Sequence, residues 1–145
     1  MKAEQGGFPE PPPEAVLIRR ARQARGMTRA QAAERSGVVK ASRWGQIENG
    51  YVMKAGVPVP TKPGDMQLAH MARTVGVSPE RLDEVGSQAA AEILREILQQ
   101  DRVYADLSDR LERTAWEMPL PLDERKLIVD MLREAKAQGR QERGA

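Results

Sequence analysis

Residues 26–50 read GMTRAQAAERSGVVKASRWGQIENG, and this stretch decides the fold. Thr28, followed three residues later by Gln31, forms a capping-box pattern that marks the start of a short helix. Gly37 ends that helix, because glycine adopts the backbone of a sharp turn at little steric cost. A second helix is predicted over about residues 40–49. The stretch therefore predicts two short helices joined by a glycine turn.

Three further helices are predicted around this pair. Residues 14–25 repeat apolar side chains at i, i+4 and i+7 before a glycine. Residues 65–75 carry an apolar stripe, and Asp65 can cap their helix. Residues 78–85 open with Ser-Pro-Glu, which supplies an N-cap, a proline at the first helical position and an acid in the first turn. Residues 51–64 contain three prolines and two glycines and are predicted to form a long extended loop or a short hairpin.

The C-terminal half has a different period. Apolar side chains recur every seven residues from Ala90 to Met118, which predicts a long amphipathic helix. Pro119 and Pro121 break it, and a last helix with one apolar face begins at Asp123. Two helices joined by a tight proline turn form an αα-hairpin. The expected parts are a flexible N-terminal tail over 1–13, a five-helix domain over 14–86, the helical hairpin over 87–138 and a frayed tail over 139–145.

Charge is distributed unevenly along the chain. Residues 14–50 hold eight Lys and Arg against three acids, whereas residues 88–145 hold ten basic and twelve acidic side chains. A basic segment favours a nucleic-acid surface, and a solvated arginine-rich helix face is the alternative. The chain has no Cys and a single His, His70, so we expect neither a disulfide nor a metal site. Its apolar runs are too short to span a membrane.

Two parts of the chain resemble one family. Residues 26–38 and 44–50 resemble the Cro/phage-repressor-type helix-turn-helix family, also called XRE-like, and residues 68–82 resemble its fourth and fifth helices. The resemblance implies an all-α fold in which a five-helix lambda-repressor-like domain precedes the C-terminal two-helix hairpin. Trp44 stands where the family usually has Ile, one residue later than the common spacing. This variant is similar to a subgroup seen in actinobacterial regulators.

The resemblance also implies DNA contacts. The helix over 40–49 is then the recognition helix, which lies in the major groove of double-stranded DNA. Arg pairs with guanine, Gln with adenine, Ser with either and Ala with a thymine methyl, which suits the base-reading positions Ala41, Ser42, Arg43 and Gln46. Phosphate contacts are expected from Thr28, Arg29, Lys40, Asn49 and Lys54. Four residues are expected to hold the motif together: Arg22 and Glu48 as an ion pair, with Trp44 and Ile47 as core anchors.

The seven-residue repeat is typical of a coiled-coil interface. Two helices of about 29 and 16 residues cannot cover both apolar faces by packing on each other, so we expect a homodimer of hairpins. In the alternative, the long helix packs only on the last helix of its own chain. The residues expected at the dimer interface are Leu94, Ile97, Tyr104, Leu111, Leu127 and Met131.

Together these features predict a sequence-specific DNA-binding transcriptional regulator, expected to be a repressor that binds an inverted repeat as a dimer. It would act in the cytoplasm of a bacterial or phage-infected cell, at the nucleoid. Two alternatives remain: an antitoxin-like protein whose hairpin binds a partner protein, and a phage-encoded regulator of lysogeny. The carboxylate pairs Asp123/Glu124 and Asp106/Asp109 have no nucleophile or phosphate cradle nearby, so we expect no enzyme and no cofactor.

Overall fold

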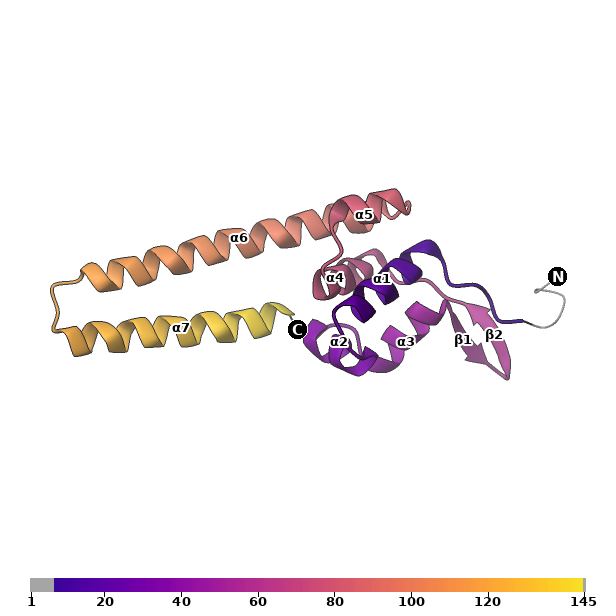
Figure 1. Ribbon diagram of the computed structural model, residues 1–145, viewed down its shortest axis with the longest axis horizontal. Coiled ribbons are helices and arrows are strands. Elements are labelled where there is room, and N and C mark those ends of the chain that lie inside the picture. The colour runs from indigo at the N-terminus through magenta and orange to yellow at the C-terminus, as the bar shows by residue number, and fades with distance from the viewer. Residues whose placement is uncertain (1–6, 145) are drawn as a thin grey trace. The chain divides into compact units, whose positions relative to one another are not determined.

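The computed structural model describes residues 7–144 and shows seven helices and one two-stranded sheet within them (Figure 1). The chain forms two compact units, Met1–Arg95 and Glu96–Ala145. The structure is mostly helical, as predicted, but the sheet is an element that an all-α class does not include. Residues 1–6 of the predicted flexible tail and residue 145 of the predicted frayed end lie outside the described residues.

The first unit contains five helices, a β-hairpin and the beginning of a sixth helix. In order these are α1 Pro13–Ala24, α2 Arg29–Ser36, α3 Ala41–Asn49, β1 Tyr51–Lys54, β2 Val57–Pro60, α4 Asp65–Val75 and α5 Pro79–Glu84. Helix α6 runs over Gln88–Glu117 and α7 over Leu122–Gly144. The units meet within α6, after Arg95, whereas the sequence predicts a division after residue 86. The difference arises because the first turns of α6 are buried, at Ala90, Ala91 and Leu94.

The core of the first unit holds α3 in a fixed orientation. Trp44 and Ile47 of α3 are fully buried together with Ile18 of α1, Met71 of α4 and Leu82 of α5. Burying an aliphatic side chain of this size contributes about 1.5–3 kcal/mol. Trp44 and Ile47 therefore occupy the core positions that their spacing predicts, and the opposite face of α3 points away from the core.

The sequence predicts the N-cap of α2 correctly and the N-cap of α4 incorrectly. At α2, the Thr28 hydroxyl accepts from the N–H of Gln31 at 3.1 Å and the Gln31 side-chain oxygen accepts from the N–H of Thr28 at 2.9 Å, which confirms the predicted capping box. At α4, Asp65 is already the first helical residue. The N-cap is Gly64, whose N–H donates to the Gln67 side chain at 3.2 Å, so the predicted Asp65 cap is wrong.

Residues 51–64 contain a hairpin, the second of the two predicted alternatives. β1 and β2 pair antiparallel from Tyr51↔Pro60 to Lys54↔Val57. The two residues between the strands, Ala55 and Gly56, have φ angles of 50° and 77°. Positive φ at both central positions is the pattern of a type I′ turn, whose twist matches that of the strands it joins.

Part of the predicted flexible tail packs on this hairpin. The ring of Phe8 lies 4.8 Å from the ring of Tyr51, measured between centroids. A Cβ added at Gly50 would lie 2.8 Å from the Cα of Pro11, so the two backbones are in close contact. Pro13 already belongs to α1. Among the described residues, the segment before α1 is therefore anchored to the first unit rather than loose.

The second unit is a helical hairpin made by α7 and the C-terminal part of α6 (Figure 1). Its core contains Ala115 and Val129, which are almost completely buried. Two ion pairs link the helices, Arg133 to Glu112 at 3.4 Å and Lys136 to Asp109 at 3.2 Å. The predicted αα-hairpin is thus present in this unit.

Helix α7 continues to Gly144, whereas the sequence predicts an end at residue 138. Gly139 is a packing position and not a stop signal. A methyl group on Gly139 would lie 2.5 Å from the hydroxyl oxygen of Tyr104. The absence of a side chain therefore lets α7 approach the Tyr104 ring closely.

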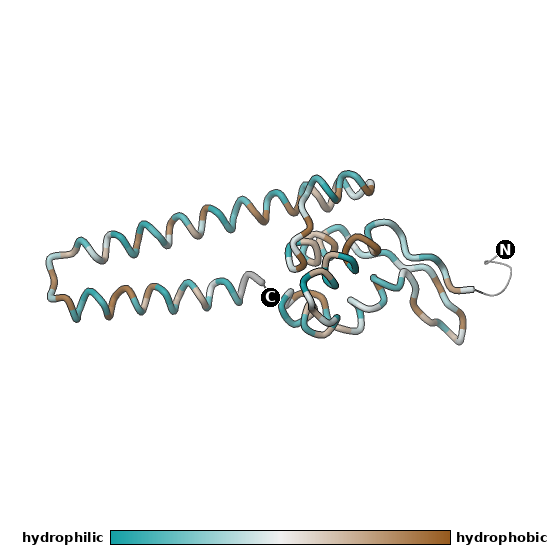
Figure 2. The backbone as a smooth tube through the Cα atoms, viewed as in Figure 1, coloured by the Kyte–Doolittle hydropathy of each residue, from teal (hydrophilic) through white to brown (hydrophobic). Residues whose placement is uncertain are grey.

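Hydrophobic and hydrophilic segments alternate along α6 and α7 (Figure 2). No helix in residues 7–144 combines the length and apolar character that a membrane span requires. Several large apolar side chains of the helical hairpin are nevertheless exposed. We call five of them the open apolar face, because they recur every four residues along their helices: Val103, Leu107 and Leu111 on α6, with Leu127 and Met131 on α7.

Candidate nucleic-acid interface

The turn between α2 and α3 is built around a buried serine. The Ser36 hydroxyl donates to the carbonyl of Ala33 at 2.7 Å and accepts from the N–H groups of Val38 and Val39 at 3.3 and 3.2 Å. Gly37 follows in the left-handed conformation, with φ 65°. The sequence predicts the turn from Gly37 but misses Ser36, although a serine beside a turn glycine often bonds to nearby backbone groups.

Helix α3 presents most of the predicted base-reading residues on one side. Ala41 and Ser42 are exposed, and Arg43 and Gln46 are half-exposed. Trp44, Ile47 and Glu48 are buried on the other side. An α-helix with one exposed polar face fits the major groove, where base edges offer hydrogen-bond partners.

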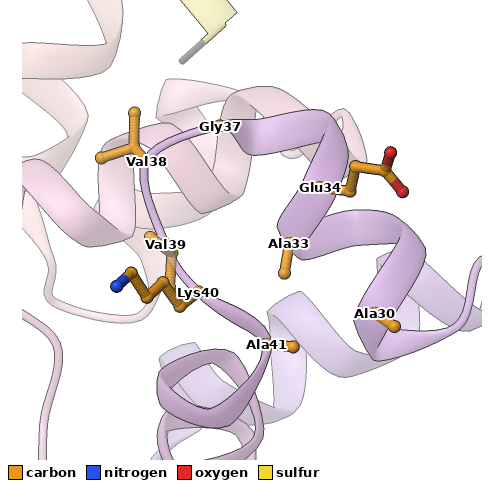
Figure 3. A pocket seen from close by; sticks show the side chains of 8 residues that line it. All are labelled: Ala30, Ala33, Glu34, Gly37, Val38, Val39, Lys40 and Ala41. Carbon is orange, nitrogen blue, oxygen red and sulfur yellow. The ribbon is translucent and has the colours of Figure 1, made fainter.

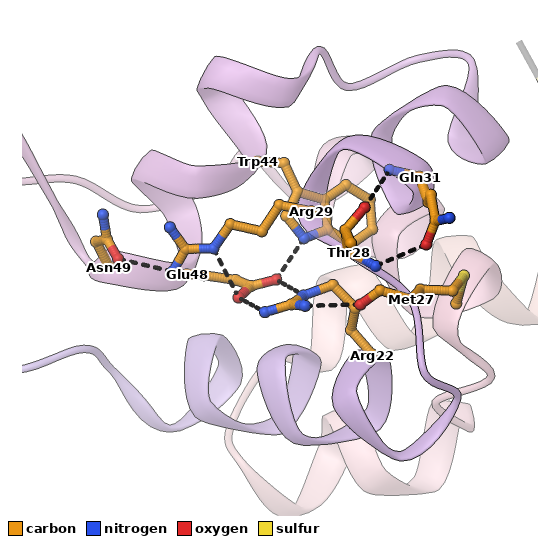
Figure 4. Close-up of polar contacts among 8 residues, drawn as sticks. All are labelled: Arg22, Met27, Thr28, Arg29, Gln31, Trp44, Glu48 and Asn49. Carbon is orange, nitrogen blue, oxygen red and sulfur yellow. Dashed lines mark hydrogen bonds and ion pairs between the residues drawn. The ribbon is translucent and has the colours of Figure 1, made fainter.

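The buried face of α3 carries a carboxylate that joins three helices (Figure 4). Glu48 accepts from Arg22 Nε at 2.7 Å and from Arg22 Nη2 at 2.8 Å, so the expected pair is present and bidentate. Trp44 Nε1 also donates to Glu48, and Arg29 Nε lies 3.3 Å from its second oxygen. Glu48 therefore fixes α3 relative to α1 and α2.

These donors also set the protonation of Glu48. Burial by itself raises the pKa of the carboxyl group. Hydrogen bonds from Arg22 and Trp44, with the charges of Arg22 and Arg29, outweigh burial and hold the pKa of Glu48 below its ordinary value. The hydrogen bond from Glu48 raises the pKa of Arg22. Both groups are thus charged at neutral pH.

Two of the residues expected to bind phosphate lie side by side (Figure 4). Arg29, at the first position of α2, donates from Nη2 to the Asn49 side-chain oxygen at 2.9 Å. Asn49 ends α3. Thr28, the N-cap of α2, completes the group, and the backbone N–H groups of a helix N-terminus favour anions. The start of α2 and the end of α3 therefore form one basic corner.

The remaining two expected phosphate contacts lie elsewhere on the first unit. Lys40 is the exposed N-cap residue of α3, and Lys54 is the exposed last residue of β1. Beside Lys40 is an open pocket of about 400 Å³ between α2 and the start of α3 (Figure 3). Its lining is mostly small and aliphatic, including the exposed Val38, and Glu34 and Lys40 are its charged members.

Arg43 has an intramolecular role that the sequence does not predict. Its Nη1 donates to the Thr61 hydroxyl at 2.9 Å and its Nη2 to the carbonyl of Lys62 at 2.9 Å. The Gln46 side-chain oxygen lies 3.5 Å from Nη1, at the limit of a hydrogen bond. The guanidinium expected to read a base therefore binds the segment that follows β2.

The residues expected at a dimer interface fall into three groups. Leu94 is fully buried at the beginning of α6, so it belongs to the core of the first unit and its assignment is corrected. Ile97 and Tyr104 are half-buried. Three are exposed and belong to the open apolar face: Leu111 at 46%, Leu127 at 61% and Met131 at 61%.

Within residues 7–144 no group of three or more His, Asp or Glu side chains is arranged to hold a metal ion. His70 is half-buried on α4, and its pKa is lowered by burial and by the nearby charge of Arg73. The described part of the chain thus offers a basic, helix-based surface and no cluster of ligating side chains.

Comparison with known proteins agrees with this geometry. Residues 15–85 match the family model described as a helix-turn-helix domain. Comparisons with curated proteins and with solved structures gave no match. The matched residues run from the first turn of α1 to the end of α5, including the turn at Gly37 and the buried face of α3. Residues 15–85 are therefore a helix-turn-helix domain of the XRE/Cro-like type.

Proposed function

We propose that this protein is a sequence-specific DNA-binding transcriptional regulator. The observation that carries the proposal is the two-sided character of α3. Trp44, Ile47 and Glu48 fix one side in the core, and the other side offers Ala41, Ser42 and Gln46 to solvent. A helix held in this way places its exposed side chains in a major groove about 12 Å wide.

Three of the four residues expected to read bases keep that role. The Gln46 amide suits adenine N6 and N7, the Ser42 hydroxyl suits several base edges, and the Ala41 methyl suits thymine. Arg43 is the expected guanine reader, but its guanidinium is held against the segment after β2, where it donates to the Thr61 hydroxyl and the Lys62 carbonyl. We therefore assign base reading to Ala41, Ser42 and Gln46.

Phosphate binding is assigned to the basic corner formed by Thr28, Arg29 and Asn49, and separately to Lys40 at the start of α3. Arg29 keeps donor capacity beyond its bonds to Glu48 and Asn49, since a guanidinium carries five N–H groups. The N–H groups at the start of α2 add to the attraction. This binding does not depend on base sequence and weakens steeply as salt rises.

The helical hairpin supports a dimer of this regulator. The open apolar face leaves five large side chains exposed on α6 and α7, and exposed large apolar side chains favour association. A second copy offers the same face, which suits the self-complementary contact of a twofold dimer. A dimer brings two copies of the first unit to one DNA molecule, at half-sites about 34 Å apart, and a bound promoter is then closed to polymerase.

The same exposed face supports a second candidate, an antitoxin-like protein whose helical hairpin binds a different protein. The two candidates differ in what covers the open apolar face. A chain that sediments as a dimer supports the regulator with a homodimeric hairpin. A chain that sediments as a monomer and binds specific DNA supports a hairpin that binds a partner protein.

Selection of bound duplexes from a random pool tests the proposed function. The full-length chain is expected to enrich an inverted repeat with half-sites about one helical turn apart. Failure to enrich any sequence, with binding that only follows salt concentration, would contradict sequence-specific recognition. Sedimentation of the same preparation with and without the selected duplex gives the number of chains bound.

A further inference from the structure

The β1–β2 hairpin follows α3 with almost no linker. Helix α3 ends at Asn49 and β1 begins at Tyr51, so only Gly50 lies between them, with φ 83°. The segment before α1 contacts the base of the hairpin, where the ring of Phe8 packs on the ring of Tyr51 and Pro11 packs on Gly50. The direction of the hairpin is therefore fixed by the orientation of α3.

Arg43 adds a second connection between α3 and the end of the hairpin. It donates to the Thr61 hydroxyl and to the carbonyl of Lys62, both at 2.9 Å. The N–H of Thr61 also donates to the carbonyl of Gly50 at 3.0 Å. These bonds hold the residues after β2 against α3, through Arg43 in its first turn and Gly50 at its C-terminal end.

The charge of the hairpin suits a polyanion. Residues 51–64 contain two lysines, Lys54 and Lys62, and no acidic residue. Lys54 is the last residue of β1, next to the Ala55-Gly56 turn, so its charge is carried beside a turn made of two small residues. DNA phosphates attract such a charge strongly, and slim basic elements fit along the grooves.

The outer edge of β2 does not suit the addition of a protein strand. Pro58 and Pro60 lie in β2 and have no N–H to donate, so the cross-strand donors of β2 are Val57 and Val59. Prolines on the outward-facing positions block the addition of a further strand. Addition of a partner strand at β2 is therefore disfavoured, and charge complementarity favours duplex DNA.

We propose that the β1–β2 hairpin is a DNA-contacting wing whose Lys54 binds a backbone phosphate beside the half-site read by α3. This inference rests on the proposed function, because it requires α3 to lie in the major groove. A strand of four residues spans roughly 13 Å at 3.3 Å per residue, which is comparable to the ~12 Å width of that groove. The tip therefore reaches the backbone that borders the groove.

Arg43 is then a positioning residue of the wing. It acts through Thr61 and Lys62 and sets the angle at which the wing leaves α3. Its loss is expected to weaken contacts at the flank of the half-site and to leave the base preference of the half-site unchanged.

Lys54→Gln and Arg81→Gln form a matched pair for the first test. Both side chains are exposed in the first unit, and both substitutions remove one positive charge. Hydroxyl-radical footprints and salt titrations of the full chain are recorded on the sequence selected by the wild type. Lys54→Gln should lose protection at the flank and reduce the salt slope by about 0.9, whereas Arg81→Gln should retain both. Identical behaviour of the two variants would overturn the wing.

Thr61→Val tests the role of Arg43, because it removes the hydroxyl and keeps the shape of the side chain. Thr61→Val should lose part of the flank protection that Arg43→Ala loses, because the bond to the Lys62 carbonyl remains, and the double variant should lose no more than Arg43→Ala alone. If Arg43→Ala changes the preferred base at one position and Thr61→Val has no effect, Arg43 reads a base and the positioning role is wrong. A wild type that enriches no sequence refutes the proposed function itself, so the two failures are distinct.

Discussion

Glu48 is fully buried and accepts hydrogen bonds from Arg22, Arg29 and Trp44, so one carboxylate joins α1, α2 and α3. A buried ion pair adds little net stability compared with apolar residues of the same volume, but removing one partner costs about 3–5 kcal/mol. The network therefore fixes the position of the recognition helix more than it raises total stability. That position decides which side chains of α3 lie on its exposed side.

The stability of the first unit is expected to fall in acid because of Glu48. Its pKa is lower in the folded chain than in the unfolded chain, where a glutamate titrates near 4.3. Its contribution is therefore complete above about pH 4.3 and is lost as the pH falls through the folded pKa. Urea unfolding followed by circular dichroism between about pH 3 and pH 7 measures this slope.

Glu48→Gln is the variant for that experiment, and Glu34→Gln on the exposed side of α2 is its control. Glu48→Gln should lower the free energy of unfolding at pH 7 and flatten its decline in acid, because the variant carries no titrating carboxyl group at this position. Glu34→Gln should retain the wild-type slope. Equal slopes for the wild type and Glu48→Gln would show that another group causes the acid sensitivity.

At the residue scale, the sequence predicts the core and the local caps better than the long polar contacts. Trp44 and Ile47 follow from helical spacing, and the Arg22–Glu48 pair follows from the family resemblance. The bonds from Arg43 to Thr61 and Lys62 join residues 18 and 19 positions apart. A long flexible side chain selects such partners only after the tertiary fold has formed, so no local pattern indicates them.

At the scale of elements, glycines and capping residues predict the ends of helices α1 to α5 to within one or two residues. For residues 51–64 the sequence predicts either a loop or a short hairpin, because the prolines there suit a loop as well as an edge strand. The predicted end of α7 at residue 138 is wrong. The prediction uses Gly139 as a stop signal, because glycine often follows the last residue of a helix, but α7 continues to Gly144. Position 139 has no room for a Cβ, because the side chain of Tyr104 on α6 lies against it.

Gly139→Ala therefore tests the contact between α6 and α7. Alanine is favoured over glycine in a helix interior by about 1 kcal/mol, but overpacking a close contact costs about 1–3 kcal/mol. The new methyl group would lie 2.5 Å from the Tyr104 hydroxyl oxygen, so we expect a lower midpoint of urea unfolding.

The same substitution in a Tyr104→Phe background is the control. Without the hydroxyl oxygen the nearest atom of the ring is 3.1 Å away, so the penalty should shrink and helix propensity should offset most of it. A wild-type chain made more stable by Gly139→Ala would show that α7 does not approach Tyr104 this closely.

At the scale of the whole molecule, the chain divides its tasks between two units. The first unit carries the helix-turn-helix domain, and the second leaves the open apolar face uncovered. The seven-residue repeat indicates an interface in the helical hairpin, but its first member, Ala90, is buried in the first unit, as is the neighbouring Leu94. A repeat in the sequence identifies an apolar face and does not show which unit covers it.

Leu111→Asp with Met131→Asp should convert the proposed dimer to a monomer without unfolding the first unit. Both side chains are exposed on the open apolar face, so charge there disrupts association and leaves the cores intact. Affinity for a palindromic duplex should fall by roughly 10²–10⁴-fold, because the two units then bind independently. Sedimentation at tens of micromolar measures the first effect and fluorescence anisotropy the second.

Ala105→Asp is the control for this pair, since it adds a charge at an exposed position of α6 outside the open apolar face. It should remain a dimer. A wild-type chain that is already monomeric would contradict the homodimer, and the open apolar face would then be assigned to a different protein partner.

The central claim is that the exposed side of α3 reads DNA bases, and selection from a random duplex pool with wild type and Gln46→Ala tests it most directly. The claim predicts that wild type enriches an inverted repeat and that Gln46→Ala enriches the same repeat with one base pair per half-site no longer specified. Its affinity for the wild-type site should fall by about 1–3 kcal/mol. An identical enriched sequence for both proteins, with equal affinity, would contradict base reading by α3.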